Sequence, residues 1–307
     1  MALLDPQHQN LERVLAVQIA VSPDHQKFLT RRLTSLVPGE RELLEDIARH
    51  VVNFCEDALD QFAEDYAWLC EQQMEEELHF RRTGRYRLST FEEAYDQVYS
   101  NREYMTRYMN GLLLTQLWWS NHTRVMGFYR SHFLATHPDG YSHLEIGPGH
   151  GLFLYLAAAD PRAGIVSAWD VSETSLALTA KALSKLGLKL LPELKMQDLF
   201  DKPSGQFDSI VFSEVLEHME RPRHALETIR PLLSDRGRLF VNMPINSPAP
   251  DHLFNLETPE DLDRLLKDVG YTVLDSAYFP ATNRTLEAAR RKKLTISCAF
   301  ILGKDRS

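Results

Sequence analysis

Several features that mark other classes of protein are scarce or missing in this sequence of 307 residues. Only three cysteines occur, Cys55, Cys70 and Cys298, and no two of them form a Cys-x-x-Cys pair. An odd, sparse set favours free thiols in a reducing compartment. No apolar run approaches the 18 or so residues of a membrane span, and the N-terminal MALLDPQHQNLERV is too polar and acidic for a signal peptide. We therefore expect a cytoplasmic protein with no membrane partner.

Basic residues are also fewer than acidic ones. The chain has 34 Lys and Arg against 43 Asp and Glu, a formal net charge of -9, and its basic residues do not gather into one long block. A nucleic-acid backbone would be repelled by such a surface, so a nucleic-acid partner is not expected. An Asn-Pro-Pro-Tyr-like segment is missing too, since SEVLEH stands after the fourth predicted strand. A small-molecule substrate fits these observations better.

The first part of the chain is predicted to be helical almost throughout, from about residue 11 to 133. Apolar residues recur at spacings of three and four over 41–80, between turn signals at 38–40 and 82–87. A capping box at Ser89–Glu92 predicts the start of the next helix. Gly111 interrupts the pattern, and a further helix is expected from Leu112 to about Phe133. We assign residues 1–138 to a helical cap that holds the substrate.

From residue 142 onward, short β-like runs alternate with helix patterns, which predicts a doubly wound, mostly parallel sheet of the α/β class. Five runs are followed by crossovers, and two closing runs with a short connection indicate a hairpin on one edge. Residues 139–307 are therefore assigned to a Rossmann-like domain with seven strands. The runs are HLEIG, IVSAWD, one within LKLLPELKMQDLF, FDSIVFSEV, GRLFVNMPI, YTVLDSAYF and LTISCAFILG.

A glycine-rich turn follows the first predicted strand, in HLEIGPGHG. Its glycines are Gly147, Gly149 and Gly151, whereas the dinucleotide fingerprint places the third glycine one position later, at Leu152. Such a turn lets backbone approach a ligand closely, and the helix behind it offers free N–H groups. Glu145, near the strand end, would oppose a pyrophosphate and favour a ligand with positive charge. S-adenosylmethionine carries a sulfonium and an ammonium group.

Two further carboxylates stand where a nucleoside site needs them. Asp170 ends the second strand and is placed to bind ribose hydroxyls, and Asp198 at the end of the third is placed to accept from an adenine amino group. Taken alone, Asp170 is equally consistent with capping the following helix, and Asp198 with an ordinary acidic residue in a loop. Their order, each at a strand end after the glycine turn, predicts a nucleoside site. SEVLEH then ends the fourth strand and faces the reaction zone, with Glu214 and His218 as candidate catalytic groups.

At this point the sequence resembles the class I S-adenosylmethionine-dependent methyltransferases over about residues 140–303. The resemblance implies S-adenosylmethionine as cosubstrate and a role for each matching position. Glu145 and the three glycines would line the methionine part. The residues that would hold ribose and adenine are Asp170, Val171, Asp198 and Leu199. The residues that would border the sulfonium are Ser213 and Glu214. The segments that carry the resemblance are LEIGPGHG, AWDVS, QDLF, residues 207–244 and residues 251–271.

The same SEVLEH segment resembles the metal-binding segment of ubiquinone-type O-methyltransferases, in which Glu214, Glu217 and His218 would be ligands. On a helix these three residues share one face. That spacing serves a metal, but it equally serves a buried histidine bonded to its neighbours. Members without a metal share these letters, so no metal is expected here.

The cap is expected to decide the chemistry, because the resemblance implies that such additions form a lid and a substrate pocket. Trp118, Asn121, His122 and Val125 share one helical face just before the first strand. Asn121 or His122 is placed to position or deprotonate an acceptor. Aromatic side chains nearby either stabilise the sulfonium by cation–π attraction or pack the helices onto the sheet. The resemblance also implies that cap helices of this kind can pair into homodimers.

Three functions stay open on these residues. The first is methyl transfer to an O, N or C atom of a small molecule in specialised metabolism, which needs alignment and exclusion of water rather than a catalytic triad. The second is cyclisation of S-adenosylmethionine to azetidine-2-carboxylate, as in azetidine-2-carboxylate synthases, with release of methylthioadenosine; aminocarboxypropyl transfer is a variant. The third is a non-catalytic module that only binds the cofactor.

Overall fold

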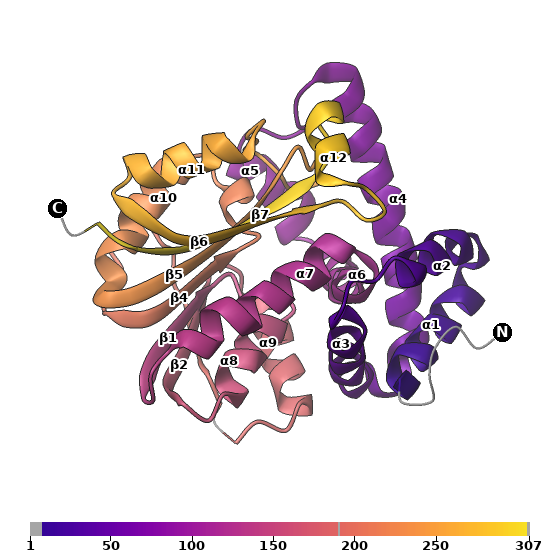
Figure 1. The fold of residues 1–307 in the computed structure, drawn as a ribbon, viewed down its shortest axis with the longest axis horizontal. Coiled ribbons are helices and arrows are strands. Elements are labelled where there is room, and N and C mark those ends of the chain that lie inside the picture. The colour runs from indigo at the N-terminus through magenta and orange to yellow at the C-terminus, as the bar shows by residue number, and fades with distance from the viewer. Residues whose placement is uncertain (1–7, 190, 306–307) are drawn as a thin grey trace.

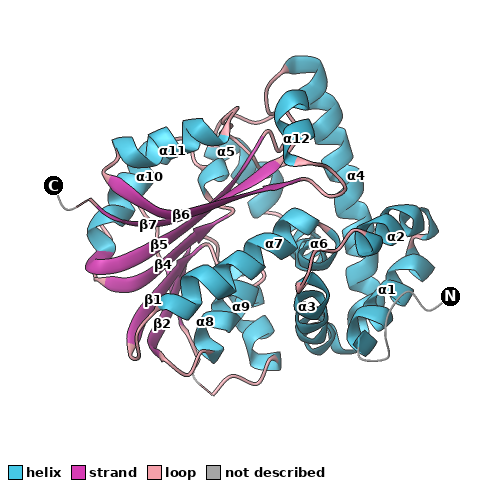
Figure 2. Cartoon of the chain, viewed as in Figure 1, coloured by secondary structure: helices cyan, strands magenta, loops and turns pink. Residues whose placement is uncertain are grey.

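Seven strands form one mixed sheet in the computed structural model, which describes residues 8–189 and 191–305. The strand order is β3-β2-β1-β4-β5-β7-β6, with β1 to β5 parallel and β7 antiparallel to both of its neighbours. The predicted α/β class with a helical cap is thus confirmed (Figure 2). The strands are β1 Tyr141–Ile146, β2 Ala163–Asp170, β3 Glu193–Met196, β4 Phe207–Ser213, β5 Leu233–Ile245, β6 Tyr271–Pro280 and β7 Ile296–Lys304.

Helices cover both faces of this sheet (Figure 1). Alternate residues of a strand enter different cores: Phe240 of β5 packs with the α7 and α8 side, while Leu239 and Val241 pack with α10 and α11. The strands are therefore apolar on both sides, as a doubly covered sheet requires. The covering helices are α7 Ser120–Phe128, α8 Leu152–Ala159, α9 Glu173–Lys185, α10 Pro222–Ile229 and α11 Pro259–Asp268.

Most of the remaining helices lie to one side of the sheet, and helices α1 to α6 form the cap (Figure 1). Their buried residues belong to the same continuous core as one face of the sheet, so cap and sheet are packed together. The assignment of residues 1–138 and 139–307 to separate domains stays a prediction. The cap helices are α1 Gln9–Val21, α2 Gln26–Thr34, α3 Glu40–Cys55, α4 Leu59–Thr83, α5 Phe91–Ala94 and α6 Arg102–Trp118, with a π-helical turn at Tyr95–Tyr99.

A buried ion pair ties the cap together. The Arg32 guanidinium of α2 lies 2.7 Å from the Glu40 carboxylate at the start of α3, and both side chains are 1% exposed. Arg124 of α7 reaches the same carboxylate at 3.2 Å. Because removal of either partner would leave a charge buried, this contact fixes α2 and α3 against α7.

Three details of the predicted helices are wrong. The helix expected over 41–80 is broken, because Glu56 has φ 51° and a 3₁₀ turn separates α3 from α4. The capping box lies one residue later than expected, at Thr90 with Glu93. Gly111 does not interrupt its helix: α6 runs through it, and the break falls at Trp119.

Gly111 is a packing position. A Cβ atom there would lie 2.9 Å from Leu69 Cβ and 3.0 Å from the Asp65 carbonyl oxygen, so the missing side chain lets α6 approach α4 closely. The predicted closing hairpin is present, but helix α12 Leu286–Lys292 lies in its connection, and its second strand, β7, sits inside the sheet. No helix among the described residues is both long and apolar enough to cross a membrane.

Candidate active site

A cavity of about 530 Å³ lies over the carboxyl ends of β1, β2 and β4, where the cap meets the sheet. Helix α6 and the segment 91–99 supply its cap side, while the strand ends supply the opposite side. Ligands of open α/β sheets bind at these strand ends, because the loops there leave the sheet in different directions. The cavity is therefore the candidate site for the cofactor and its reaction partner.

The glycine turn after β1 adopts a backbone that other residues avoid. Gly147, Gly149 and Gly151 have φ values of 70°, 51° and 78°. A Cβ on Gly147 would lie 2.7 Å from Val215 Cγ2, so glycine also lets the β4 loop pack against the turn. Gly147 and Gly149 line the cavity, whereas Gly151 does not and instead starts α8.

Glu145 at the end of β1 lines the cavity and is 3% exposed, and its Oε2 has no hydrogen-bond partner among the described residues. Burial raises the pKa of this carboxyl well above its usual range. A cationic ligand would pair with this oxygen and would stabilise the charged form of the carboxyl, because a buried carboxylate without a partner is costly.

The predicted ribose and adenine residues line one continuous part of the cavity, namely Asp170, Val171, Asp198 and Leu199. Asp170 Oδ1 accepts from the Ser172 backbone N–H at 2.8 Å, and Oδ2 accepts from Ser175 Oγ at 2.7 Å. Each oxygen keeps a second lone pair for a ligand. Asp198 Oδ1 accepts from the Phe200 N–H at 2.8 Å, which shapes the turn after β3.

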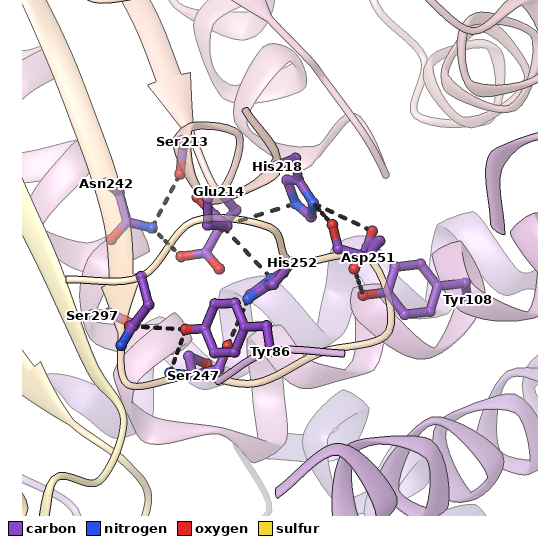
Figure 3. Close-up of polar contacts among 12 residues, drawn as sticks. Tyr86, Tyr108, Ser213, Glu214, His218, Asn242, Ser247, Asp251, His252 and Ser297 are labelled. Atoms are coloured by element: carbon purple, nitrogen blue, oxygen red, sulfur yellow. Dashed lines mark hydrogen bonds and ion pairs between the residues drawn. The ribbon is translucent and has the colours of Figure 1, made fainter. Parts of the chain in front are cut away.

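Ser213 and Glu214 end β4 beside Asn242 of β5 (Figure 3). Asn242 Nδ2 donates to Glu214 Oε1 at 2.6 Å and to Ser213 Oγ at 3.2 Å. Glu214 has φ 54°, an unusual backbone for a non-glycine residue and one that clusters at functional sites. Burial raises its pKa to about 7, with the Asn242 bond acting in the opposite direction.

His218 belongs to a polar network that joins cap and sheet (Figure 3). Its Nδ1 lies 3.1 Å from the Tyr99 hydroxyl and 3.0 Å from the Asp251 carbonyl oxygen. Tyr99 and Tyr108 donate to the two Asp251 carboxylate oxygens at 3.1 and 2.8 Å. Burial opposes ionisation of Asp251, but His218, His252 and the two hydroxyls outweigh it and lower its pKa.

The network includes groups to which the sequence had given no role. Asp251 follows β5 in an irregular loop, and nothing periodic marks it. Its one signal is the Asp251-His252 pair of polar residues directly after a proline-containing loop over the cavity. The aromatic side chains of the cap were expected as cation–π or packing surfaces, whereas the hydroxyls of Tyr99 and Tyr108 make the contacts that fix Asp251.

The two candidates on α7 separate in the structure. His122 lines the cavity, its Nδ1 lies 2.8 Å from Thr115 Oγ1, and burial lowers its pKa to about 3, so the ring is neutral. Asn121 lies outside the lining and donates to Ser297 Oγ of β7 at 3.0 Å. Asn121 therefore points at β7 and away from the cavity, which does not favour the catalytic role predicted for it.

Glu217, His218 and His252 form one group of potential ligand atoms, all within 4.8 Å of one another. Glu214, which the sequence resemblance placed in a metal set, is not in this group. His252, from the loop after β5, is the third member of the group instead.

Comparison with known proteins bears on this site. The model of a family described as a methyltransferase domain matches residues 118–276, just over half of the chain. The ubiquinone biosynthesis O-methyltransferase of Caulobacter vibrioides is 32% identical over 105 residues, which cover 34% of this chain and 40% of that protein. The protein of the same name from Dechloromonas aromatica is 27% identical over 112 residues, 36% of this chain and 47% of that one.

The chain thus spans less than half the length of the curated relatives it matches. Among solved structures, the YcgJ protein of Bacillus subtilis has a TM-score of 0.49 and 13% identity, covering 61% of this chain and all of that one.

Proposed function

The chain belongs to the methyltransferase domain family, within the class I S-adenosylmethionine-dependent methyltransferases, and on that premise we propose that it transfers the methyl group of S-adenosylmethionine to a small molecule. The observation that carries this proposal is the cavity itself. It joins a glycine turn, the Asp170 carboxylate and the unpartnered Glu145 at the carboxyl ends of three parallel strands.

The charges of the lining suit this cosubstrate. The cavity is lined by seven acidic residues and a single arginine, Arg221; the acids are Glu145, Asp170, Asp198, Glu214, Glu217, Glu220 and Asp251. A phosphate-bearing nucleotide would be repelled, whereas a sulfonium is attracted. We assign Glu145 and the glycine turn to the methionine part, and Asp170 with Asp198 to ribose and adenine.

In the proposed reaction an acceptor atom attacks the methyl carbon in line with the sulfonium. The acceptor–carbon bond forms, the carbon–sulfur bond breaks, and the sulfur keeps the electron pair as S-adenosylhomocysteine leaves. The chain would contribute alignment and exclusion of water, because methyl transfer from a sulfonium needs no activated leaving group. Glu214 and the His218 network border the expected acceptor position.

Incubation of the purified protein with S-adenosylmethionine alone, read by mass spectrometry, tests the proposal against its alternatives. Methylthioadenosine with a stoichiometric cyclic amino acid, above the spontaneous background, would overturn methyl transfer and establish a cyclase. Without such turnover, a panel of amines, phenols and carboxylic acids is screened for release of S-adenosylhomocysteine. Release with one class supports the proposal; binding without release from any class indicates a cofactor-binding module.

A further inference from the structure

The polar end of the cavity holds an unusual group of side chains, here called the Glu217 cluster, made of Glu217, His218 and His252. Glu217 is fully buried, and neither carboxylate oxygen has a hydrogen-bond partner among the described residues. Its Oε1 lies 3.9 Å from His218 Nε2 and 4.0 Å from His252 Nε2. These distances are too long for hydrogen bonds, so the three groups surround a position that none of them fills.

When its ring is neutral, each histidine presents the Nε2 lone pair to this position. His218 Nδ1 lies 3.0 Å from the carbonyl oxygen of Asp251, and His252 Nδ1 lies 2.6 Å from that of Ser247. A carbonyl oxygen only accepts, so each Nδ1 carries the hydrogen, and in the neutral ring Nε2 is then an acceptor.

The side chains near the cluster that can donate hydrogen bonds contact other groups. Tyr99 and Tyr108 donate to the Asp251 carboxylate, and Asn242 Nδ2 donates to Glu214 and Ser213. Arg221, the arginine of the lining, has its guanidinium carbon 4.9 Å from the centre of the Phe200 ring. The Glu217 cluster therefore receives no hydrogen bond from these neighbours, in a buried place where an unpaired polar group is costly, and burial raises the pKa of the Glu217 carboxyl well above its usual range.

We propose that the methyl acceptor is a primary or secondary amine whose protonated nitrogen binds the Glu217 cluster, donating to Glu217 and to both Nε2 atoms. This inference rests on the proposed methyl transfer and names its substrate class. Hydrogen bonds of about 2.8 Å from one nitrogen reach acceptors about 4–4.6 Å apart. Bonds of about 2.1 Å from a metal reach ligands only about 3–3.4 Å apart. The observed spacings of 3.9 and 4.0 Å favour the ammonium group.

The nitrogen held there is the one that receives the methyl group. Its proton passes to the Glu217 carboxylate, and the freed lone pair attacks the methyl carbon. The carbon–nitrogen bond forms as the carbon–sulfur bond breaks, and the sulfur keeps the electron pair. The products are S-adenosylhomocysteine, the N-methylated ammonium and protonated Glu217, so the total charge is unchanged. Glu217 returns its proton to solvent when the product leaves.

Calorimetric titration of the protein saturated with S-adenosylhomocysteine tests the inference, with n-butylamine and its neutral isostere n-butanol as probes. We expect butylamine to bind at least tenfold more tightly than butanol. The variant Glu217→Gln should remove this preference. It keeps the shape of a side chain that makes no hydrogen bond, so it should still fold. The matched control is Glu227→Gln, the same charge change on the exposed face of α10, which should keep the preference.

A second variant keeps the inference testable if Glu217→Gln does not fold. His252→Phe removes one acceptor and should weaken butylamine binding several-fold without changing the affinity for butanol. Equal binding of the two probes by the wild-type protein would overturn the inference. Stoichiometric binding of Zn²⁺ that depends on Glu217 and excludes butylamine would overturn it in favour of a metal site. Release of S-adenosylhomocysteine with phenols but not amines would overturn the assignment of an amine acceptor and keep the proposed methyl transfer. Failure to bind S-adenosylhomocysteine would contradict the proposed function itself.

Discussion

The Tyr108 hydroxyl of α6 donates a hydrogen bond of 2.8 Å to the carboxylate of Asp251, and both side chains are buried. This contact fastens the cap to the loop after β5, which also carries His252. Tyr99 binds the other oxygen of the same carboxylate at 3.1 Å. The position of the loop over the cavity therefore depends on two hydroxyl groups that come from a different part of the chain.

Replacement of Tyr108 by phenylalanine should lower the free energy of unfolding by about 1.5–3 kcal/mol, because a hydrogen bond to a buried charged group is lost. Urea denaturation at pH 7 measures the change. Tyr104→Phe is the matched control, since Tyr104 lies one turn earlier on α6 and its hydroxyl has no hydrogen-bond partner among the described residues. Equal effects of the two variants would contradict a specific contribution of the Tyr108–Asp251 bond.

The assignment of Asp170 to the ribose can be tested by binding. Asp170→Asn should weaken the affinity for S-adenosylhomocysteine at least tenfold, because hydrogen bonds to a charged acceptor are worth about 1.5–3 kcal/mol each. Isothermal titration calorimetry gives the dissociation constants. Asp201→Asn changes the charge equally at an exposed position outside the lining and should bind as the wild type does. An affinity of Asp170→Asn within twofold of the wild type would remove Asp170 from the site.

Glu214 should make the unliganded protein less stable as the pH rises. Burial raises the pKa of its carboxyl from 4.5 to about 7 in the folded state. The folded state therefore binds the proton more tightly than the unfolded state, and stability falls between about pH 4.5 and pH 7 and stays lower above.

Glu214→Gln is neutral throughout, so its free energy of unfolding should exceed that of the wild type by about 3 kcal/mol at pH 8 and by about 1 kcal/mol at pH 5. Urea denaturation at the two pH values checks this, with the exposed Glu227→Gln as control. A stability difference that does not change with pH would show that the Glu214 carboxyl does not have a raised pKa.

Gly111 and Gly127 offer a matched pair of helix glycines. A Cβ at Gly111 would meet Leu69 Cβ at 2.9 Å and the Asp65 carbonyl oxygen at 3.0 Å, neither of which moves easily. A Cβ at Gly127 would meet only the end of the Leu43 side chain, at 2.9 Å. We expect Gly111→Ala to cost about 1–2 kcal/mol through overpacking, despite its better helix propensity.

For Gly127→Ala the same propensity gain should leave stability unchanged or raised by about 0.5 kcal/mol. Thermal and urea unfolding of the two variants, side by side, give the comparison. If Gly111→Ala proved as stable as Gly127→Ala, the close approach of α6 to α4 would not limit the packing of the cap.

The sequence alone was sufficient for the sheet and for much of the cofactor side of the cavity. Strand runs such as IVSAWD carry a strong local pattern, and the carboxyl ends of the parallel strands β1 to β5 lie at one edge, so Asp170 and Asp198 could be located from their positions. The glycine turn was recognisable because positive φ restricts the residue type.

The rest depended on contacts between distant parts of the chain. The break at Glu56 has no glycine or proline to mark it, and Gly111 resembles a helix breaker unless the neighbouring helix α4 is known. Asn121 and His122 are adjacent in the sequence, yet one faces β7 and the other the cavity. Asp251 and His252 lie in a loop without periodicity, so only the folded structure brings them to His218.

The position of β7 has a consequence for the order in which the sheet assembles. β7 follows β6 along the chain, yet it lies between β5 and β6 and pairs with both. β6 therefore has no strand to pair with until β7 has entered the sheet, because β7 is its neighbour there. The edge of β5 stays open for the same interval, and an open edge of an apolar strand invites pairing with other chains. The edge of β5 is therefore the part of the sheet most open to pairing with other chains until β7 has folded onto it.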